Sequence, residues 1–126
     1  MRPKTLAEVA ALSAGGDSFE RCLANFLDEF YAAPDAKALA EAPRLLAPGL
    51  SEPGRVRDAY LAATAEELAR AYQFRVPAWT AEETRTLQRP WFASQLESLR
   101  AVLLLESPAA FRSRNLFIGQ NALTRA

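Results

Sequence analysis

The chain has 126 residues, half of which are apolar. This length and composition fit one ordinary globular domain with its own core, and they argue against a disordered chain. Basic and acidic residues balance at 15 each, whereas a domain that functions on nucleic acid usually carries a basic excess that neutralises phosphates.

Several chemistries lack the residues that they need. The sequence contains no histidine and one cysteine, Cys22, so the commonest general base, the commonest zinc ligand and any internal disulfide are missing. The five glycines do not have the spacing of a phosphate-binding loop. We therefore expect no cofactor and no metal, and we interpret Cys22 as a core residue.

The sequence contains no long apolar segment. The longest strongly apolar run covers residues 101–105, which is far shorter than the ~20 residues of a membrane-spanning helix. Near the N-terminus, Glu8 and the pair Gly15 and Gly16 break the first apolar stretch, so no secretion signal is visible. These features predict a cytoplasmic protein without a membrane partner.

The first two predicted helices have clear boundary signals. Thr5 and Glu8 have the spacing of a capping box, and Gly15 ends the helix that they begin. A second helix follows a cap at Asp17 or Ser18 and carries one continuous apolar stripe at helical period. Its members are Phe19, Cys22, Leu23, Phe26, Leu27 and Phe30.

Proline and glycine divide the middle of the chain. A short third helix is expected from Asp35 to Glu41. Residues 43–54 contain three prolines and two glycines, which predicts a mobile loop. A fourth helix is expected over about residues 55–72. Because each half of the chain alone is too small for a good core, residues 1–126 are predicted to form a single domain.

The last third of the chain begins with a predicted short helix from Thr80 to about Leu87, capped by Thr80 with Glu83. A helix starting near Pro90 is apolar nearly all round, with Phe92, Leu96, Leu99 and Leu103 on one face, so it is expected to be the central helix. Ser107 is expected to cap a short helix that reaches about residue 114. The arm 115–126 is ambiguous, since residues 116–118 fit either a short strand or a packed extended segment.

These elements predict an all-α fold. We expect a single-domain bundle of six or seven short helices with a partly irregular C-terminal arm. Adjacent acidic residues occur three times, at residues 28–29, 66–67 and 82–83. Neighbours on a helix diverge by about 100°, so these pairs are interpreted as solvated helix faces and not as catalytic carboxylates.

Two regions are candidates for binding a partner. Trp79 and Trp91 lie near prolines. They are interpreted either as a clasp that packs the segment around the predicted helix of residues 80–87 onto the core or as interface anchors. The segment from residue 107 onward carries three arginines and no acidic residue, a charge of +3. It is interpreted either as an arm tied onto the core or as a recognition surface. Its candidate contact residues are Arg112, Arg114, Asn115, Asn121 and Arg125.

Three stretches of the sequence resemble a family of short bacterial proteins of uncharacterised function. They are LANFLDEFYAAP, the VPAWT and PWF pair, and the closing stretch LRAVLLLESPAAFRSRNLFIGQNALTRA. The closing stretch is the specific part, with the pattern SPAAFRxRNxFxxxNxLxRA. Genes of the family often neighbour a gene for a nucleotidyltransferase-like protein, in an arrangement similar to a toxin–antitoxin pair. The resemblance implies an accessory or antitoxin-like partner of that protein, and it implies no catalytic residues.

The sequence therefore favours a non-catalytic protein-interaction module. The alternatives are a nucleic-acid-binding regulator that uses the basic C-terminal tail and an enzyme with an unrecognised site of carboxylates and arginine. The balanced charge and the lack of a recognition helix argue against the first alternative. The second predicts acidic side chains that converge in a pocket. The sequence leaves open whether copies of the chain associate.

Overall fold

The computed structural model describes residues 2–93 and 97–125, and it confirms the all-α fold class. The helices are α1 (Leu6–Ala14), α2 (Phe19–Ala32), α3 (Lys37–Ala40), α4 (Ala47–Ala71), α5 (Glu97–Glu106) and α6 (Ala109–Arg112). Two 3₁₀ turns cover Ala78–Ala81 and Glu83–Arg85. Two short strands, β1 (Trp91–Phe92) and β2 (Leu116–Phe117), pair in parallel.

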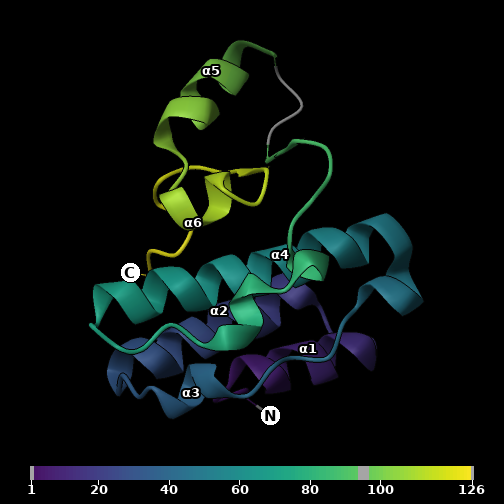
Figure 1. Cartoon of the computed structure of the whole chain (residues 1–126). Coiled ribbons are helices and arrows are strands. Elements are labelled where there is room, and N and C mark those ends of the chain that lie inside the picture. Colours follow the sequence, from purple (N-terminus) through teal and green to yellow (C-terminus); the bar gives the residue numbers. More distant parts are fainter. Residues whose placement is uncertain (1, 94–96, 126) are drawn as a thin grey trace.

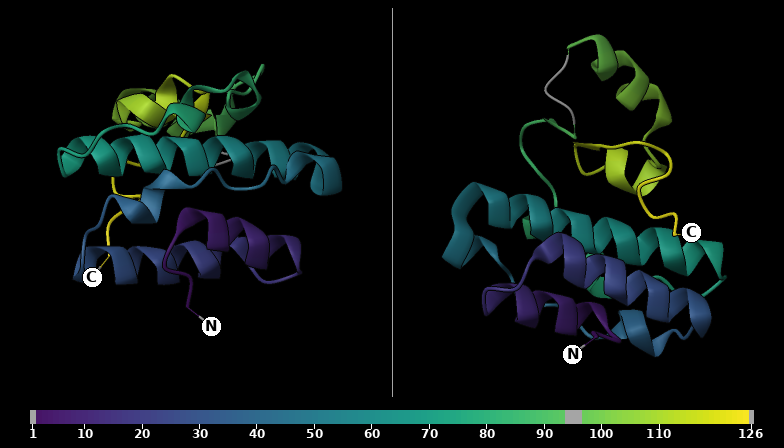
Figure 2. Two further views of the ribbon diagram at one scale, coloured as in Figure 1. Left: turned by 60° about the horizontal axis from the view of Figure 1, so that its bottom comes forward. Right: turned by 180° about the vertical axis from the view of Figure 1, so that it is seen from behind.

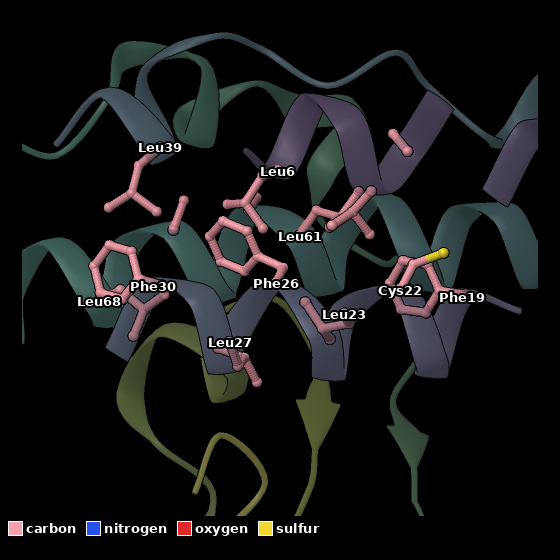
Figure 3. Close-up of a cluster of buried hydrophobic side chains, with 14 of the residues drawn as sticks. Leu6, Phe19, Cys22, Leu23, Phe26, Leu27, Phe30, Leu39, Leu61 and Leu68 are labelled. Atoms are coloured by element: carbon pink, nitrogen blue, oxygen red, sulfur yellow. The ribbon is translucent and has the colours of Figure 1, made fainter. Parts of the chain in front are cut away.

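The first two helices form as their local signals predict. The Thr5 hydroxyl accepts a hydrogen bond from the Glu8 backbone N–H at 3.0 Å, and the Glu8 carboxylate accepts the Thr5 N–H, so the capping box is confirmed. Ser18 caps α2. All six residues of the predicted α2 stripe are buried, and Figure 3 shows Leu23 and Leu27 among them on the side of the C-terminal segments. Cys22 is one of the six buried residues, which confirms it as a core residue.

Helix α4 is the central element of the fold. Figures 1 and 2 show it crossing the molecule, with α1, α2 and α3 on one side and α5, α6 and the strands on the other. One core cluster lies between α4 and the N-terminal helices, and a second lies between α4 and the C-terminal segments. The run Leu61–Ala65 is completely buried, because small side chains let both layers approach the α4 backbone.

The prediction of a loop over residues 43–54 is wrong from Ala47 onward. Helix α4 begins there, turns at Ser51, whose φ is 54°, and continues to Ala71. Pro48 and Pro53 each lie in the first turn of a helical segment, where the missing N–H costs no hydrogen bond. The proline content therefore predicted a loop in a region that forms helical turns.

This segment is also fastened to the body of α4. The Asp58 carboxylate accepts hydrogen bonds from the Leu46 N–H at 2.6 Å and the Ala47 N–H at 3.1 Å. Gly54 is buried against the same backbone, and a Cβ placed there would lie 2.6 Å from the Leu46 carbonyl carbon. These contacts argue against the mobile segment that the sequence predicts.

The prediction that the helix after Pro90 is central is also wrong. Residues 91–92 form β1 instead of a first helical turn, and α5 begins at Glu97. The expected face member Leu96 lies outside the described residues. Figure 1 shows α5 standing at the periphery of the molecule. The alanine-rich α4 occupies the centre, so a helix that is apolar nearly all round is left with one side uncovered.

Two predicted caps are replaced by other interactions. Thr80 does not form a capping box with Glu83, because its hydroxyl donates to the Pro77 carbonyl within the first 3₁₀ turn. Ser107 does not cap α6. Its hydroxyl oxygen lies 2.6 Å from the Leu103 carbonyl oxygen and 2.8 Å from the Ile118 backbone nitrogen. Ser107 therefore joins the end of α5 to the segment after β2.

The C-terminal arm is tied onto the core. Leu116 and Phe117 form β2 and are buried, so the strand interpretation is confirmed for these two residues. The arm then runs to α2, where the Tyr31 hydroxyl donates to the Leu123 carbonyl at 2.8 Å. Figure 1 shows the C-terminus beside the α4 and α2 layers.

Candidate functional site

Trp79 lies inside the molecule. Its side chain is buried, and its indole N–H donates to the Leu39 carbonyl at 3.0 Å. The Arg85 guanidinium lies over its ring at 4.9 Å from the centroid. Trp79 therefore joins α3 to the first 3₁₀ turn, as the clasp interpretation describes, and its use as an exposed anchor is corrected.

Arg114 is also an internal residue. Its guanidinium donates to Glu66 at 2.8 Å, to the Ala110 carbonyl at 2.7 Å and to the Thr80 carbonyl at 2.8 Å. Burial raises the pKa of Glu66, but hydrogen bonds from Arg114 and Arg70 outweigh it, so the net shift of this pKa is downward. Arg114 thus holds α6 against α4 and is not available on a contact surface.

Both glutamates of the acidic pair on α4, Glu66 and Glu67, stabilise the fold. Glu66 forms the ion pair with Arg114, and the Glu67 carboxylate accepts the Ala110 backbone N–H at 3.0 Å. Both glutamates are half-buried. The interpretation of this pair as a solvated face is therefore wrong, because α6 covers the face that carries them.

The remaining predicted residues of the arm divide into two groups. Asn115 has a φ of 64° and donates its side-chain amide to the Leu87 carbonyl at 2.6 Å, so it stabilises a turn. Arg125 forms a bidentate pair with Asp28 on α2. This pair lowers the pKa of Asp28, with the hydrogen bond from Arg125 as the main cause. Arg112 and Asn121 are exposed.

The first candidate surface is the exposed part of α5. Four large apolar side chains there are exposed, with exposed fractions of 41%, 42%, 45% and 81%. We call these residues the α5 surface: Leu99, Val102, Leu104 and Leu105. In the same helix, Leu103 is buried. Exposed apolar groups that gather on one element mark an interaction site more often than scattered ones do.

The second candidate site is an apolar pocket of about 620 Å³ that contains Trp91. It lies between α2, α4, β1 and the C-terminal arm. Leu23 and Leu27 line it from α2, Tyr60 from α4 and Ile118 from the arm. The volume falls in the range of small-molecule sites, which run from ~300 to ~1,000 Å³. We call it the α2–α4 pocket.

Four charged residues also line the α2–α4 pocket: Glu20, Glu52, Arg57 and Arg125. The charge of Arg125 is neutralised by its pair with Asp28. Glu20 and Glu52 are exposed, whereas Arg57 is half-buried with its guanidinium 5.5 Å from the centroid of the Phe19 ring. Among the described residues no carboxylate pairs with Arg57.

Sequence reasoning missed two buried polar residues beside the first core cluster, Asp58 and Arg85. Asp58 is fully buried, and Arg85 is 1% exposed and donates to the Pro43 carbonyl at 2.6 Å. Burial raises the pKa of Asp58, whereas the N–H groups of Leu46 and Ala47 and the charge of Arg85 lower it by less. The available signal was the position of Asp58 on the same helical face as Leu61 and Ala62, which are core residues.

These buried polar groups serve the fold. Asp58 accepts backbone N–H groups and does not line the α2–α4 pocket. In residues 2–93 and 97–125, no three residues of the His, Cys, Asp and Glu types come together as metal ligands would. Over the same ranges, none of the helices has the length and hydrophobicity that crossing a bilayer requires.

Comparison with known proteins gives no relative. No family model, no curated protein and no solved structure matches the chain.

Proposed function

We propose that the chain is a non-catalytic protein-interaction module that binds its partner through the α5 surface. The observation that supports this proposal is the exposure of four large apolar side chains on one short helix. A helix that is apolar nearly all round is normally buried on every side. Among the residues of α5 whose side chains are described, Leu103 is buried, and Ser107, which follows the helix, donates to the Leu103 carbonyl.

The fold does not need the exposed side chains of α5 to be apolar. Leu105 is 81% exposed, so a polar residue at this position would cost the fold almost nothing. Burying a leucine side chain completely stabilises a complex by about 1.5–3 kcal/mol. A partner that covers the α5 surface would recover this free energy from several side chains at once.

The resemblance supplies the candidate partner, which is the nucleotidyltransferase-like protein of the neighbouring gene. We propose an antitoxin-like or accessory role toward that protein, in the cytoplasm. The exposed residues Arg112 and Asn121 of the arm remain candidates for polar contacts at the rim of the interface. Charged rim residues set orientation and association rate more than affinity.

The other two functions find less support in the structure. Of the three arginines behind the +3 charge of the tail, Arg114 is paired with Glu66 and Arg125 with Asp28. Only Arg112 is left to contact a phosphate, which weakens the case for a nucleic-acid-binding regulator. The buried carboxylate of Asp58 is occupied by backbone N–H groups, which weakens the case for a carboxylate-based enzyme.

The test is to co-express the chain with the neighbouring protein and to measure the dissociation constant of the complex for matched variants. Leu99 and Leu50 are almost equally exposed, at 41% and 38%, but only Leu99 belongs to the α5 surface. Leu99→Gln and Leu105→Gln should each weaken binding by about tenfold or more. Leu50→Gln should leave the dissociation constant unchanged. Equal effects of Leu99→Gln and Leu50→Gln would refute the proposed surface.

A further inference from the structure

The α2–α4 pocket is separate from the α5 surface, since none of its lining residues belongs to α5. Its walls are mostly apolar. Phe19, Leu23 and Leu27 lie along one side of α2, and Ile118 and Ala122 come from the C-terminal arm. Figure 3 shows Leu23 and Leu27 on the side of α2 that faces the C-terminal segments. An apolar wall of this kind binds the hydrocarbon part of a ligand.

Two polar groups on α4 complete the pocket. Arg57 and Tyr60 both line it and are three residues apart, so they share one face of the helix. Neither the Arg57 guanidinium nor the Tyr60 hydroxyl has a hydrogen-bond partner among the described residues. Burial raises the pKa of Tyr60, and the nearby charge of Glu20 adds to the effect, so this hydroxyl stays protonated and can donate. Arg57 and Tyr60 thus offer the pocket hydrogen-bond donors that no described protein group accepts.

Arg57 gives the pocket a positive charge that no carboxylate among the described residues pairs with. Arg125 already forms a pair with Asp28. Glu20 and Glu52 are exposed, so water screens their charges more than that of the half-buried Arg57, although the charge of Glu20 still acts on Tyr60. The half-buried Arg57 is screened less, and its charge therefore interacts more strongly with a counterion.

We infer that the α2–α4 pocket binds a small amphipathic molecule that has an apolar body and a carboxylate. The apolar body lies between α2 and the C-terminal arm, and the carboxylate accepts hydrogen bonds from Arg57 and Tyr60. This inference does not depend on the proposed partner, because it involves different residues and a different class of ligand.

Three probes of equal chain length test the inference. Decanoate, decanol and decylammonium share an apolar body and differ in the charge of the head group. Trp91 lines the pocket and Trp79 does not, so the fluorescence change of Trp91 reports binding, and Trp91→Phe should abolish the signal. Decanoate should bind most tightly. Decylammonium that binds as tightly as decanoate would contradict the inference, as would the lack of a saturable signal with all three probes.

Two variants separate the head group from the body. Arg57→Gln should weaken decanoate binding by about tenfold or more, since a charged hydrogen bond is lost, and should leave decanol binding unchanged. Arg55→Gln, an exposed position outside the pocket, is the matched control and should change neither. Ala24→Leu adds bulk to the pocket wall and should weaken decanoate and decanol alike.

Circular dichroism checks that the variants fold. If Ala24→Leu does not fold, Arg57→Gln alone still tests the inference. Decanoate binding that Arg57→Gln leaves unchanged would overturn the assigned head-group site. Analytical ultracentrifugation tests the competing occupant. A dimer that dissociates in Ala24→Leu would assign the pocket to a second copy of the chain and overturn the inference.

Discussion

Replacing Gly54 by alanine sets two effects against each other. Alanine stabilises a helix interior by about 0.5–1 kcal/mol relative to glycine. At this position, however, the new Cβ would lie 2.6 Å from the Leu46 carbonyl carbon and 2.7 Å from the Ala47 Cα, whereas ordinary contacts begin at 3.4 Å. These atoms belong to the backbone, as does the nearest one, the Leu46 carbonyl oxygen, so the segment would have to move by at least the 0.8 Å between 3.4 and 2.6 Å.

This movement has an energetic cost that exceeds the gain in helix propensity. Overpacking of this kind costs about 1–3 kcal/mol. It would also lengthen the hydrogen bonds that the Asp58 carboxylate accepts from the Leu46 and Ala47 N–H groups. We therefore expect Gly54→Ala to lower the free energy of unfolding by about 2 kcal/mol.

The matched control lies in the same segment. Gly49 has no heavy atom within 4 Å of an added Cβ, so Gly49→Ala should be neutral or stabilising by up to about 1 kcal/mol. Urea unfolding followed by circular dichroism at 222 nm measures both variants. If Gly54→Ala is as stable as Gly49→Ala, then the close approach of Gly54 to the Leu46 and Ala47 backbone is wrong.

Three further perturbations probe other parts of the fold. Trp79→Phe removes the hydrogen bond to Leu39 and should destabilise the protein by about 1–3 kcal/mol, whereas Trp91→Phe should not; urea unfolding measures both. The pKa of Asp28 is lowered mainly by Arg125, so Arg125→Gln should be less stable than wild type at pH 7. This difference should disappear as the pH falls below 3.8, the ordinary pKa of that carboxyl. The Cys22 thiol, whose pKa is raised by burial, should react with a thiol reagent quickly only in denaturant.

For each of these predictions, one result would refute it. Equal losses of stability in both tryptophan variants would show that the indole hydrogen bond is not important. A stability difference between wild type and Arg125→Gln that persists at low pH would show that the arginine does not act through the aspartate. Rapid labelling of Cys22 in the native protein would place that residue outside the core.

The parts of the fold that could be predicted from sequence are those fixed by local signals. The α2 stripe has helical period, and the capping box of Thr5 needs only residues within one helical turn. Both form as predicted.

The errors concern interactions between segments that are distant in sequence. Periodicity shows that α5 is apolar, but it does not show whether other segments cover that helix. The burial of Trp79 depends on α3, 40 residues earlier in the chain. Likewise, Arg114 is internal because Glu66 and the Thr80 carbonyl lie beside it. Sequence composition alone assigns such an arginine to the surface.

The central claim is that the α5 surface contacts the partner protein. Hydrogen exchange of the chain, alone and with the neighbouring nucleotidyltransferase-like protein, tests this claim most directly. We predict that complex formation slows the exchange of the α5 amides and leaves that of the α1 and α2 amides unchanged. Slower exchange confined to other segments, or unchanged exchange throughout at saturating partner, would contradict the claim.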